Sequence, residues 1–242
     1  MILPRLYAIL DAGCFSDCEA MFAAATELVE GGVTLLQYRN KSGNARVTLE
    51  DARELKRLVS GRVRLIMNDR ADLCLAADFD GVHVGQDDLS VEAVRGILGW
   101  EPPTLAAKAD PQDGSVNASL KRCATQKQDQ EQVISQKVRG RWLGVSTHNL
   151  EQLTIADATS ADYLAIGPVF ATSSKANPDP VVGIAGVRRA RKLTRKPLVA
   201  IGGITRANAR EVIDAGADAV AVISDLIREP RKSAEEFLTI LG

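Results

Sequence analysis

The sequence predicts a (β/α)8 barrel, also called a TIM barrel: a closed ring of eight parallel strands surrounded by helices. Eight short apolar runs rich in branched residues recur along the chain, and unbroken apolarity is typical of strands buried on both faces of a parallel sheet. Most runs are followed by an amphipathic stretch, which gives alternating strand and helix units. The length of 242 residues suits such a barrel, which typically has about 250 residues. We therefore expect one α/β domain over residues 1–242.

The predicted strands, in order, are residues 6–10, 34–38, 64–67, 81–84, 143–145, 163–167, 198–201 and 219–223. Between them lie helix signals. Ser16 and Glu19 have the spacing of a capping box, Thr48 and Thr205 each precede a helical pattern, and Gly216 has the position of a helix stop. The competing architecture is an open, doubly wound sheet. It normally carries a glycine fingerprint after its first strand, and residues 11–14, Asp-Ala-Gly-Cys, are not one.

Residues 100–141 do not fit the alternating pattern, because they are rich in Gln, Lys and Arg and poor in large apolar residues. A structureless connection of this length is unusual inside a compact barrel. We expect a flexible polar insertion within the domain. A polar surface helix over residues 126–137 is the alternative.

Composition and charge narrow the class of protein. Thirty basic and 31 acidic side chains give a net charge of −1, which argues against a broad nucleic-acid-binding surface. The sequence has no apolar run long enough to cross a membrane and no signal-peptide pattern at its start. Cys14, Cys18, Cys74 and Cys123 lack the paired spacing of a zinc site. We expect a cytoplasmic protein with reduced cysteines that binds neither nucleic acid nor membrane, and the sequence leaves its oligomeric state open.

Polar residues follow nearly every predicted strand, at the end where barrel enzymes carry their active sites. These residues are Gln37, Arg39 and Lys41; Asn68, Asp69 and Arg70; Gln86, Asp87 and Asp88; Ser146, Thr147 and His148; Thr172, Ser173, Ser174 and Lys175; Gly202 and Gly203; and Ser224. One polar loop would mean little, but so many at one rim predict a site.

The residue types predict phosphorylated ligands. Arg39, Lys41 and Lys175 match phosphate charge, and Asp69 with Asp88 could hold Mg²⁺, which prefers a few carboxylates together with substrate phosphate oxygens. Cations and a metal together indicate a diphosphate. A second phosphate site is predicted after the last two strands, at 202–203 and 223–224, where barrels often bind phosphate. Two phosphorylated substrates fit this pattern better than one, and a transferase that couples them and releases pyrophosphate would use both sites.

Plainer interpretations exist for several of these residues. Asp69 and the pair 87–88 could cap the helices that follow them. His83 lies within an apolar strand and is better explained as a core residue with satisfied hydrogen bonds. His148 lies at the rim and could contact ligand or support the loop.

The motifs taken together resemble the thiamine-phosphate synthase (thiamine-phosphate pyrophosphorylase) family. They are 37–41 (Gln-Tyr-Arg-Asn-Lys), 68–70 (Asn-Asp-Arg), 81–88 (Gly-Val-His-Val-Gly-Gln-Asp-Asp), 144–148 (Gly-Val-Ser-Thr-His), 167–175 (Gly-Pro-Val-Phe-Ala-Thr-Ser-Ser-Lys), 200–204 (Ala-Ile-Gly-Gly-Ile) and 222–224 (Val-Ile-Ser). The resemblance covers almost the whole chain except residues 100–141. Asn40 and Ala171 depart from the Glu and Pro that are common in the family.

The resemblance implies a Mg²⁺-dependent transferase. It joins 4-amino-2-methyl-5-hydroxymethylpyrimidine diphosphate to 4-methyl-5-(2-phosphoethyl)thiazole, or its carboxylated form, and gives thiamine phosphate and pyrophosphate. Carried over by motif, the residues that would bind the pyrimidine diphosphate are Gln37, Tyr38, Arg39, Asn40, Lys41, Asn68, Ser146 and Lys175, of which Arg39, Lys41, Ser146 and Lys175 would serve catalysis. Asp69 and Asp88 would bind the metal. The thiazole phosphate would be bound by Thr172, Ser173, Ser174, Gly203, Ile223 and Ser224.

Two alternatives remain beside this interpretation. A related thiazole tautomerase shares the barrel, but it would need neither the Asp69 and Asp88 pair nor Lys175, and that family has His where Ser146 stands. A non-catalytic sensor of phosphorylated ligands would keep the barrel and the rim without turnover.

Overall fold

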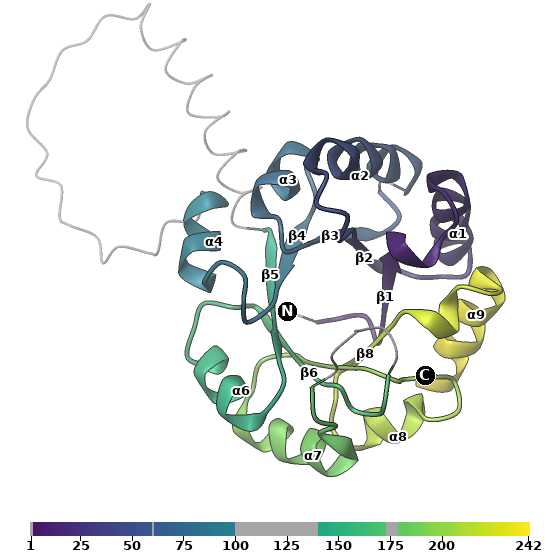
Figure 1. Ribbon diagram of the computed structural model, residues 1–242. Coiled ribbons are helices and arrows are strands. Elements are labelled where there is room, and N and C mark those ends of the chain that lie inside the picture. The colour runs from purple at the N-terminus through teal and green to yellow at the C-terminus, as the bar shows by residue number, and fades with distance from the viewer. Residues whose placement is uncertain (1, 60, 100–139, 173–178) are drawn as a thin grey trace, which may run out of the picture.

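The computed structural model describes residues 2–59, 61–99, 140–172 and 179–242, and within these ranges the chain forms a closed barrel of parallel strands inside a ring of helices (Figure 1). The strands are β1 (Leu6–Asp11), β2 (Leu35–Arg39), β3 (Arg64–Asn68), β4 (Gly81–Val84), β5 (Trp142–Thr147), β6 (Tyr163–Ile166), β7 (Leu198–Ile201) and β8 (Ala219–Val222). Each pairs with the next in the chain, and β8 pairs with β1 through the register Leu6↔Val220. The predicted barrel is confirmed.

The α-helices of the described ranges are α1 (Cys18–Glu30), α2 (Ala45–Val59), α3 (Ala71–Ala76), α4 (Val91–Ile97), α6 (Leu150–Asp157), α7 (Gly183–Leu193), α8 (Ala209–Asp214) and α9 (Pro230–Leu241). Short 3-10 turns, η1 (Ala12–Cys14) and η2 (Ser224–Leu226), follow β1 and β8. Helix α9 lies beside α1 and completes the ring (Figure 1). Among the described residues, no helix combines the length and apolarity that a membrane crossing requires.

The side chains of each strand point alternately outward and inward, which produces two apolar clusters. Leu6, Ala8 and Leu10 of β1 belong to the cluster between the barrel and the helices, whereas Tyr7 and Ile9 belong to the cluster inside the barrel. Successive side chains of a strand point to opposite faces, so every second position on each strand faces the barrel interior. Polar residues at those interior positions near the strand ends therefore converge on one cavity.

The N-terminal end of the barrel is closed by apolar and aromatic packing. Leu3 is 6% exposed and belongs to the interior cluster, and the Arg64 guanidinium stacks over the Trp142 ring at 4.1 Å from the ring centroid. This packing leaves the opposite end, where the strands finish, as the open one.

The predicted starts of α1 and α2 are wrong by a few residues. Helix α1 is capped by Asp17, whose Oδ1 accepts from the Ala20 N–H at 2.8 Å, and Ser16 donates to Asp17 instead of capping the helix. A carboxylate at this position also interacts favourably with the helix dipole. Helix α2 begins at Ala45, one turn before Thr48, whose hydroxyl donates to the Asn44 carbonyl at 2.9 Å.

The predicted start of α8 is also wrong, whereas its predicted stop is confirmed. A turn from Thr205 precedes the helix, which begins at Ala209 after Asn208. Gly216 follows its C-terminal end with φ of +107°, a left-handed conformation that favours glycine, as predicted.

The predicted insertion lies in the sequence between α4 and β5, and the described residues that flank it are at the closed end of the barrel. Arg141, which the prediction assigned to the insertion, is instead buried: its Nε donates to the Phe79 carbonyl at 3.1 Å. Arg95 of α4 donates to the Arg141 carbonyl at 3.2 Å and to Asp162 at 2.7 Å, so both flanks are held together. Residues 100–139, including the alternative helix over 126–137, lie outside the described residues.

Candidate active site

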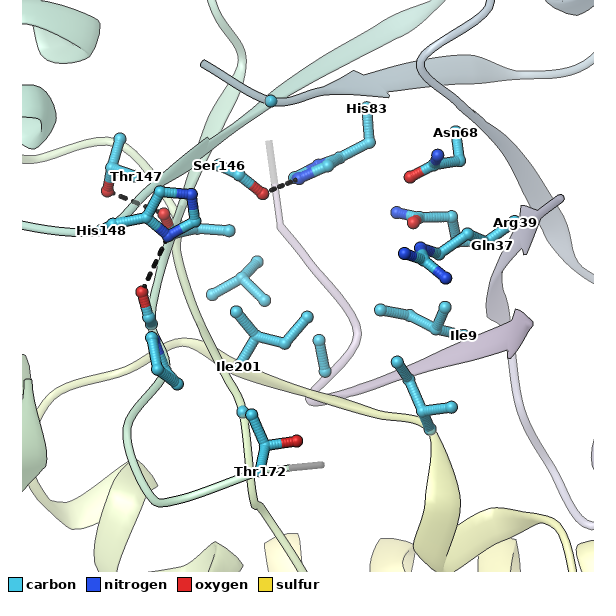
Figure 2. Close-up of a pocket in the computed structure, with 18 of the residues that line it drawn as sticks. Ile9, Gln37, Arg39, Asn68, His83, Ser146, Thr147, His148, Thr172 and Ile201 are labelled. Atoms are coloured by element: carbon cyan, nitrogen blue, oxygen red, sulfur yellow. Dashed lines mark hydrogen bonds between the residues drawn. The ribbon is translucent and has the colours of Figure 1, made fainter. Parts of the chain in front are cut away.

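A cavity of about 270 Å³ opens at the C-terminal ends of the strands. Its side chains are segregated by chemistry. Polar groups come from β2 to β5 and the loops after them, namely Gln37, Arg39, Lys41, Asn68, Asp69, His83, Gln86, Asp87, Asp88 and Ser146. The side formed by β1 and β6 to β8 is mainly apolar, with Ile9, Ala165, Val199, Ile201, Ala221 and Ile223, and its polar residues are Tyr7, Thr172, Asp179 and Ser224. The labelled side chains in Figure 2 show this arrangement, with Gln37, Arg39, Asn68, His83 and Ser146 on one side and Ile9 and Ile201 toward the other.

The structure brings together most of the residues that the sequence predicts. Those that line the cavity are Gln37, Arg39, Lys41, Asn68, Asp69, Asp88, Ser146, Thr172, Gly203, Ile223 and Ser224. Ser173, Ser174 and Lys175 lie outside the described residues.

Tyr38 and Asn40 are placed elsewhere, which does not fit their predicted contact with the pyrimidine. Tyr38 lies on the outer face of β2 in the cluster between barrel and helices, and its hydroxyl donates to Asp51 of α2 at 2.7 Å. Asn40 in turn donates to the Tyr38 hydroxyl at 3.0 Å. The reason is the two-residue period of the strand, which turns Gln37 and Arg39 inward and Tyr38 outward.

Arg39 is held by a carboxylate on the neighbouring strand. Asp11 at the end of β1 is directly opposite Arg39 in the strand register, and the two side chains form an ion pair. Asp11 also accepts from the Gly13 N–H at 3.1 Å and is 7% exposed. A half-buried guanidinium held in this way has a fixed direction, which suits recognition of an anion.

Asn68 presents a buried polar atom to the cavity. Its Nδ2 is buried and has no hydrogen-bond partner within the described part of the chain, and Figure 2 shows its side chain beside those of Gln37 and Arg39. A buried donor without a partner costs about 1–3 kcal/mol, so a ligand that accepts from Asn68 would recover that energy.

Asp69 and Asp88 approach each other at the end of β3 and β4. Burial raises the pKa of Asp69, and the neighbouring Asp88 raises it further, against the lowering effect of Lys41. Lys41 Nζ lies 2.5 Å from Asp69 Oδ2, and Asp88 accepts from the Gly85 N–H at 2.7 Å. Asp69 has φ of +61°, an uncommon left-handed conformation for a residue other than glycine, and such conformations concentrate at functional sites. Two facing carboxylates in a partly buried site favour a bound cation.

The loops after β6 and β7 pack closely against each other at the other end of the cavity. The Phe170 N–H donates to the Gly202 carbonyl at 3.0 Å, and Gly203 has φ of +64°. A Cβ on Gly203 would lie 2.5 Å from the Ala171 carbonyl oxygen, so only glycine fits. Thr172 and Ser224 line the cavity next to these loops.

Further residues line the cavity without having been assigned a ligand. Gln86, Thr147 and His148 belong to the polar rim that the sequence predicted, whereas Tyr7, His83 and Asp179 lie outside it. Tyr7 could have been found from the alternation of β1, because it shares a face with Ile9 and Asp11. His83 is both buried, as predicted for a core residue, and part of the cavity wall. His148 lies 3.0 Å from the Gly167 carbonyl oxygen and 3.4 Å from Asp179, which agrees with a role in holding the loop.

Known proteins resemble this chain over nearly its full length. The family model described as "Thiamine monophosphate synthase" matches residues 6–101 and 123–226. The chain belongs to the thiamine monophosphate synthase family. This confirms the resemblance read from the motifs, and the function of the chain is that of a thiamine-phosphate synthase, a transferase.

Individual relatives agree with the family model. A thiamine-phosphate synthase of Koribacter versatilis is 54% identical over 243 residues, covering 99% of this chain and 96% of its own length. That of Chloroflexus aurantiacus is 37% identical and covers 92% of this chain and 85% of its own length. The structure of thiamine phosphate pyrophosphorylase from Pyrococcus furiosus has a TM-score of 0.73 and 29% identity, covering 98% of this chain and 95% of that chain.

Proposed function

We propose that the chain joins 4-amino-2-methyl-5-hydroxymethylpyrimidine diphosphate to 4-methyl-5-(2-phosphoethyl)thiazole, or its carboxylated form, and releases thiamine phosphate and pyrophosphate. The observation that carries the proposal is the divided cavity, with cations, carboxylates and amides on one side and an apolar wall that ends at the glycine-lined loops on the other. A polar diphosphate substrate and a thiazole with one phosphate match these two halves.

The residues present fit a Mg²⁺ ion. Asp69 and Asp88 face each other closely enough that the Asp88 carboxylate disfavours the charged form of Asp69. Within the described ranges no group of three or more His, Cys, Asp or Glu side chains is placed to hold a metal. Mg²⁺ differs from metals that need such a group, because it commonly binds one or two carboxylates and completes its shell with water and substrate phosphate oxygens. In the proposal, Asp69 and Asp88 hold the ion, which when bound offsets negative charge on the diphosphate.

The side chains of the polar half would bind and orient the pyrimidine diphosphate. Arg39, fixed by Asp11, and Lys41 would bind the diphosphate, as would Lys175, which is proposed from its motif alone. Gln37, Asn68 and Ser146 would contact the pyrimidine ring. The bond from the methylene carbon to the diphosphate oxygen breaks, and its electron pair leaves with pyrophosphate. The aminopyrimidine stabilises the carbocation, which the lone pair of the thiazole nitrogen then captures to form the C–N bond.

The apolar half would place that nitrogen. Thr172, Ser173, Ser174, Gly203, Ile223 and Ser224 are proposed to hold the thiazole phosphate, with Ser173 and Ser174 assigned from the motif alone. Holding both substrates in line accounts for much of the rate enhancement in such a reaction, and stabilisation of the departing charge accounts for the remainder.

The proposed activity is tested by supplying both substrates with Mg²⁺ to the full chain and measuring thiamine phosphate and pyrophosphate together. We expect the two products in equal amounts. Binding of both substrates by the folded protein without product would favour a sensor of phosphorylated ligands. Binding of the thiazole phosphate alone would favour a tautomerase-like barrel.

The metal assignment has a separate test. The Asp88→Ala variant is expected to lose most coupling activity and its dependence on Mg²⁺ concentration, while its affinity for the thiazole phosphate stays within about twofold of the wild-type value, since separated sites act independently. Coupling that does not change across a Mg²⁺ titration of the wild-type chain would contradict the assignment.

We also propose that the chain acts in the cytoplasm. Its described cysteines Cys14, Cys18 and Cys74 are free thiols, two of them exposed, which is common where the environment is reducing. The proposed partners are the two phosphorylated small molecules, with no nucleic acid or membrane.

A further inference from the structure

A continuous chain of hydrogen bonds crosses the barrel interior beneath the cavity. Gln37 Nε2 lies 2.7 Å from the Tyr7 hydroxyl, which lies 3.0 Å from the Tyr163 hydroxyl. The Tyr163 hydroxyl lies 3.0 Å from His83 Nδ1, and His83 Nε2 lies 2.8 Å from Ser146 Oγ. This series of hydrogen bonds thus links Gln37 on β2 to Ser146 on β5, two side chains that both line the cavity.

The three middle residues are buried, and Tyr7 and His83 also form part of the cavity wall. Tyr7 is 1% exposed, Tyr163 is 0% exposed and His83 is 7% exposed. The backbone of β5 makes room for the Tyr163 ring, because a Cβ on Gly144 would lie 2.1 Å from the nearest ring atom. Burial raises the pKa of Tyr7 and Tyr163 and lowers the pKa of His83 to about 4. Both tyrosine hydroxyls therefore stay protonated near pH 7, and each has a single hydrogen to donate.

The order of donors and acceptors gives this series of hydrogen bonds a direction. The Gln37 amide nitrogen can only donate, so the Tyr7 oxygen accepts and its hydrogen is donated to Tyr163. Tyr163 then donates to His83 Nδ1, which leaves the imidazole hydrogen on Nε2, and Nε2 donates to Ser146 Oγ. At the two ends, Gln37 keeps its carbonyl oxygen as an acceptor for a ligand, beside its second amide hydrogen, and Ser146 keeps its hydroxyl hydrogen as a donor. Figure 2 shows the His83 imidazole directed at Ser146.

The geometry points to Tyr7, Tyr163 and His83 as positioning residues that set the hydrogen-bond polarity of Gln37 and Ser146. They act through those two residues, so the cavity offers an acceptor at Gln37 and a donor at Ser146. This inference rests on the proposed function for its ligand: the amino group of an aminopyrimidine donates and its neighbouring ring nitrogen accepts. In the 4-oxo analogue the oxo group accepts and the neighbouring ring N–H donates. The hydrogen bonds set by Tyr7, Tyr163 and His83 therefore disfavour binding of this analogue.

The first test removes one hydroxyl from the middle of the chain. In the Tyr163→Phe variant we expect the Kd for the 4-aminopyrimidine diphosphate, measured by calorimetry with Mg²⁺ and without thiazole, to rise about tenfold, the usual order for a lost hydrogen bond that leaves a partner unpaired. The preference for the 4-amino over the 4-oxo diphosphate should fall by a similar factor. The Kd for the thiazole phosphate should not change.

Tyr38→Phe is the matched control. Tyr38 is also buried, at 0% exposed, and its hydroxyl also donates a hydrogen bond, but it lies on the outer face of β2. We expect this variant to keep the wild-type preference for the 4-amino compound. Equal loss of preference in both variants, or no loss in Tyr163→Phe, would overturn the positioning role. If Tyr163→Phe fails to fold, Tyr7→Phe tests the same chain one residue earlier.

A second test needs no substrate and so separates this inference from the proposed function. The ¹⁵N shifts of the His83 imidazole should show a neutral ring protonated on Nε2 in the wild-type chain, with a mixture of tautomers in Tyr163→Phe. A wild-type ring protonated on Nδ1 would overturn the stated polarity, whether or not the protein couples the two substrates. Failure of coupling together with the Nε2 tautomer and an intact 4-amino preference would instead count against the proposed function alone.

Discussion

Asp11 fixes the direction of Arg39 from the neighbouring strand, and it is the residue most closely tied to a predicted diphosphate-binding side chain. Its carboxylate is nearly buried and bonds both the Arg39 guanidinium and the Gly13 N–H. The sequence motifs do not reveal Asp11 as a site residue, because the ion pair depends on the register that places Asp11 opposite Arg39. Register between parallel strands is not readable from either strand alone.

The substitution Asp11→Asn tests this arrangement. Asparagine keeps the size of the side chain but loses the charge, so Arg39 should no longer be held in one direction, and we expect the Kd for the pyrimidine diphosphate to rise about tenfold. Glu50→Gln is the control, because Glu50 pairs with Arg46 on the exposed face of α2, where such pairs contribute little. Equal affinities of Asp11→Asn and wild type would show that Arg39 does not depend on Asp11.

His83 gives the stability of the protein a pH dependence. Its pKa is lowered by burial from 6.5 to about 4 in the folded chain, so between these values the unfolded state binds a proton that the folded state does not. Stability due to His83 is therefore complete above about pH 6.5 and falls as the pH drops toward 4, by at most about 3 kcal/mol. The measurement is urea unfolding of wild type and His83→Gln at several pH values. The variant should show a shallower fall, and parallel curves would contradict the assignment.

The chain has only two histidines, which makes an independent check direct. NMR of the imidazole groups gives two signals, and the His148→Gln variant identifies the one that belongs to His83. A His83 signal that titrates near pH 6.5 in the folded protein would show that the ring is not shielded from water.

At the scale of elements, the sequence predicted the strands well and the helix starts less well. Unbroken apolar runs located β1 to β8 because strands inside a ring of helices are buried on both faces. Helix starts depend on which of several polar residues caps the first turn, and at α1 both Ser16 and Asp17 had suitable side chains. The outward position of Tyr38 could have been predicted from the two-residue period of β2. The contact of Tyr7 with Tyr163 could not, because it joins strands on different sides of the ring.

The loop after β7 offers a prediction at this scale. Gly203→Ala places a Cβ 2.5 Å from the Ala171 carbonyl at a residue with φ of +64°, so the loops after β6 and β7 must separate. We expect the affinity for the thiazole phosphate to fall by at least about tenfold, with the affinity for the pyrimidine diphosphate little changed. Calorimetry with each ligand separately measures both.

The control for this substitution is Gly61→Ala. Gly61 has a similar φ of +78°, but among the described residues no atom other than those of its chain neighbours lies within 4 Å of the added Cβ. It should cost about 1 kcal/mol of stability through backbone strain and leave both affinities unchanged. An equal effect of the two substitutions on thiazole phosphate binding would show that strain alone, and not the packing of the loops, is responsible.

At the scale of the whole molecule, the two ends of the barrel have separate roles. The end where the strands finish carries the cavity, whereas the opposite end is closed by Leu3, Arg64 and Trp142. The stretch that the sequence predicted to be an insertion is attached at this closed end, between α4 and β5. From the sequence alone its position relative to the rim stayed open, because the direction of each connection follows only once the barrel is closed.

This attachment predicts that residues 101–139 are not required for the proposed coupling. Arg95 holds the flanks together through the Arg141 carbonyl and Asp162, so a Gly/Ser linker of about six residues, which spans roughly 15 Å, should join α4 to β5 without moving either. We expect the shortened chain to fold and to couple the two substrates with a kcat/KM within about threefold of the full chain, since changes far from a site usually act independently of it. Steady-state kinetics and thermal unfolding of both chains are the measurements.

The Arg95→Met variant of the shortened chain is the control for the flanks. It should lower Tm, because it removes a buried cation with three hydrogen bonds, and the cavity residues should still bind both ligands. A shortened chain that folds with the wild-type Tm but has lost coupling would show that residues 101–139 contribute to catalysis.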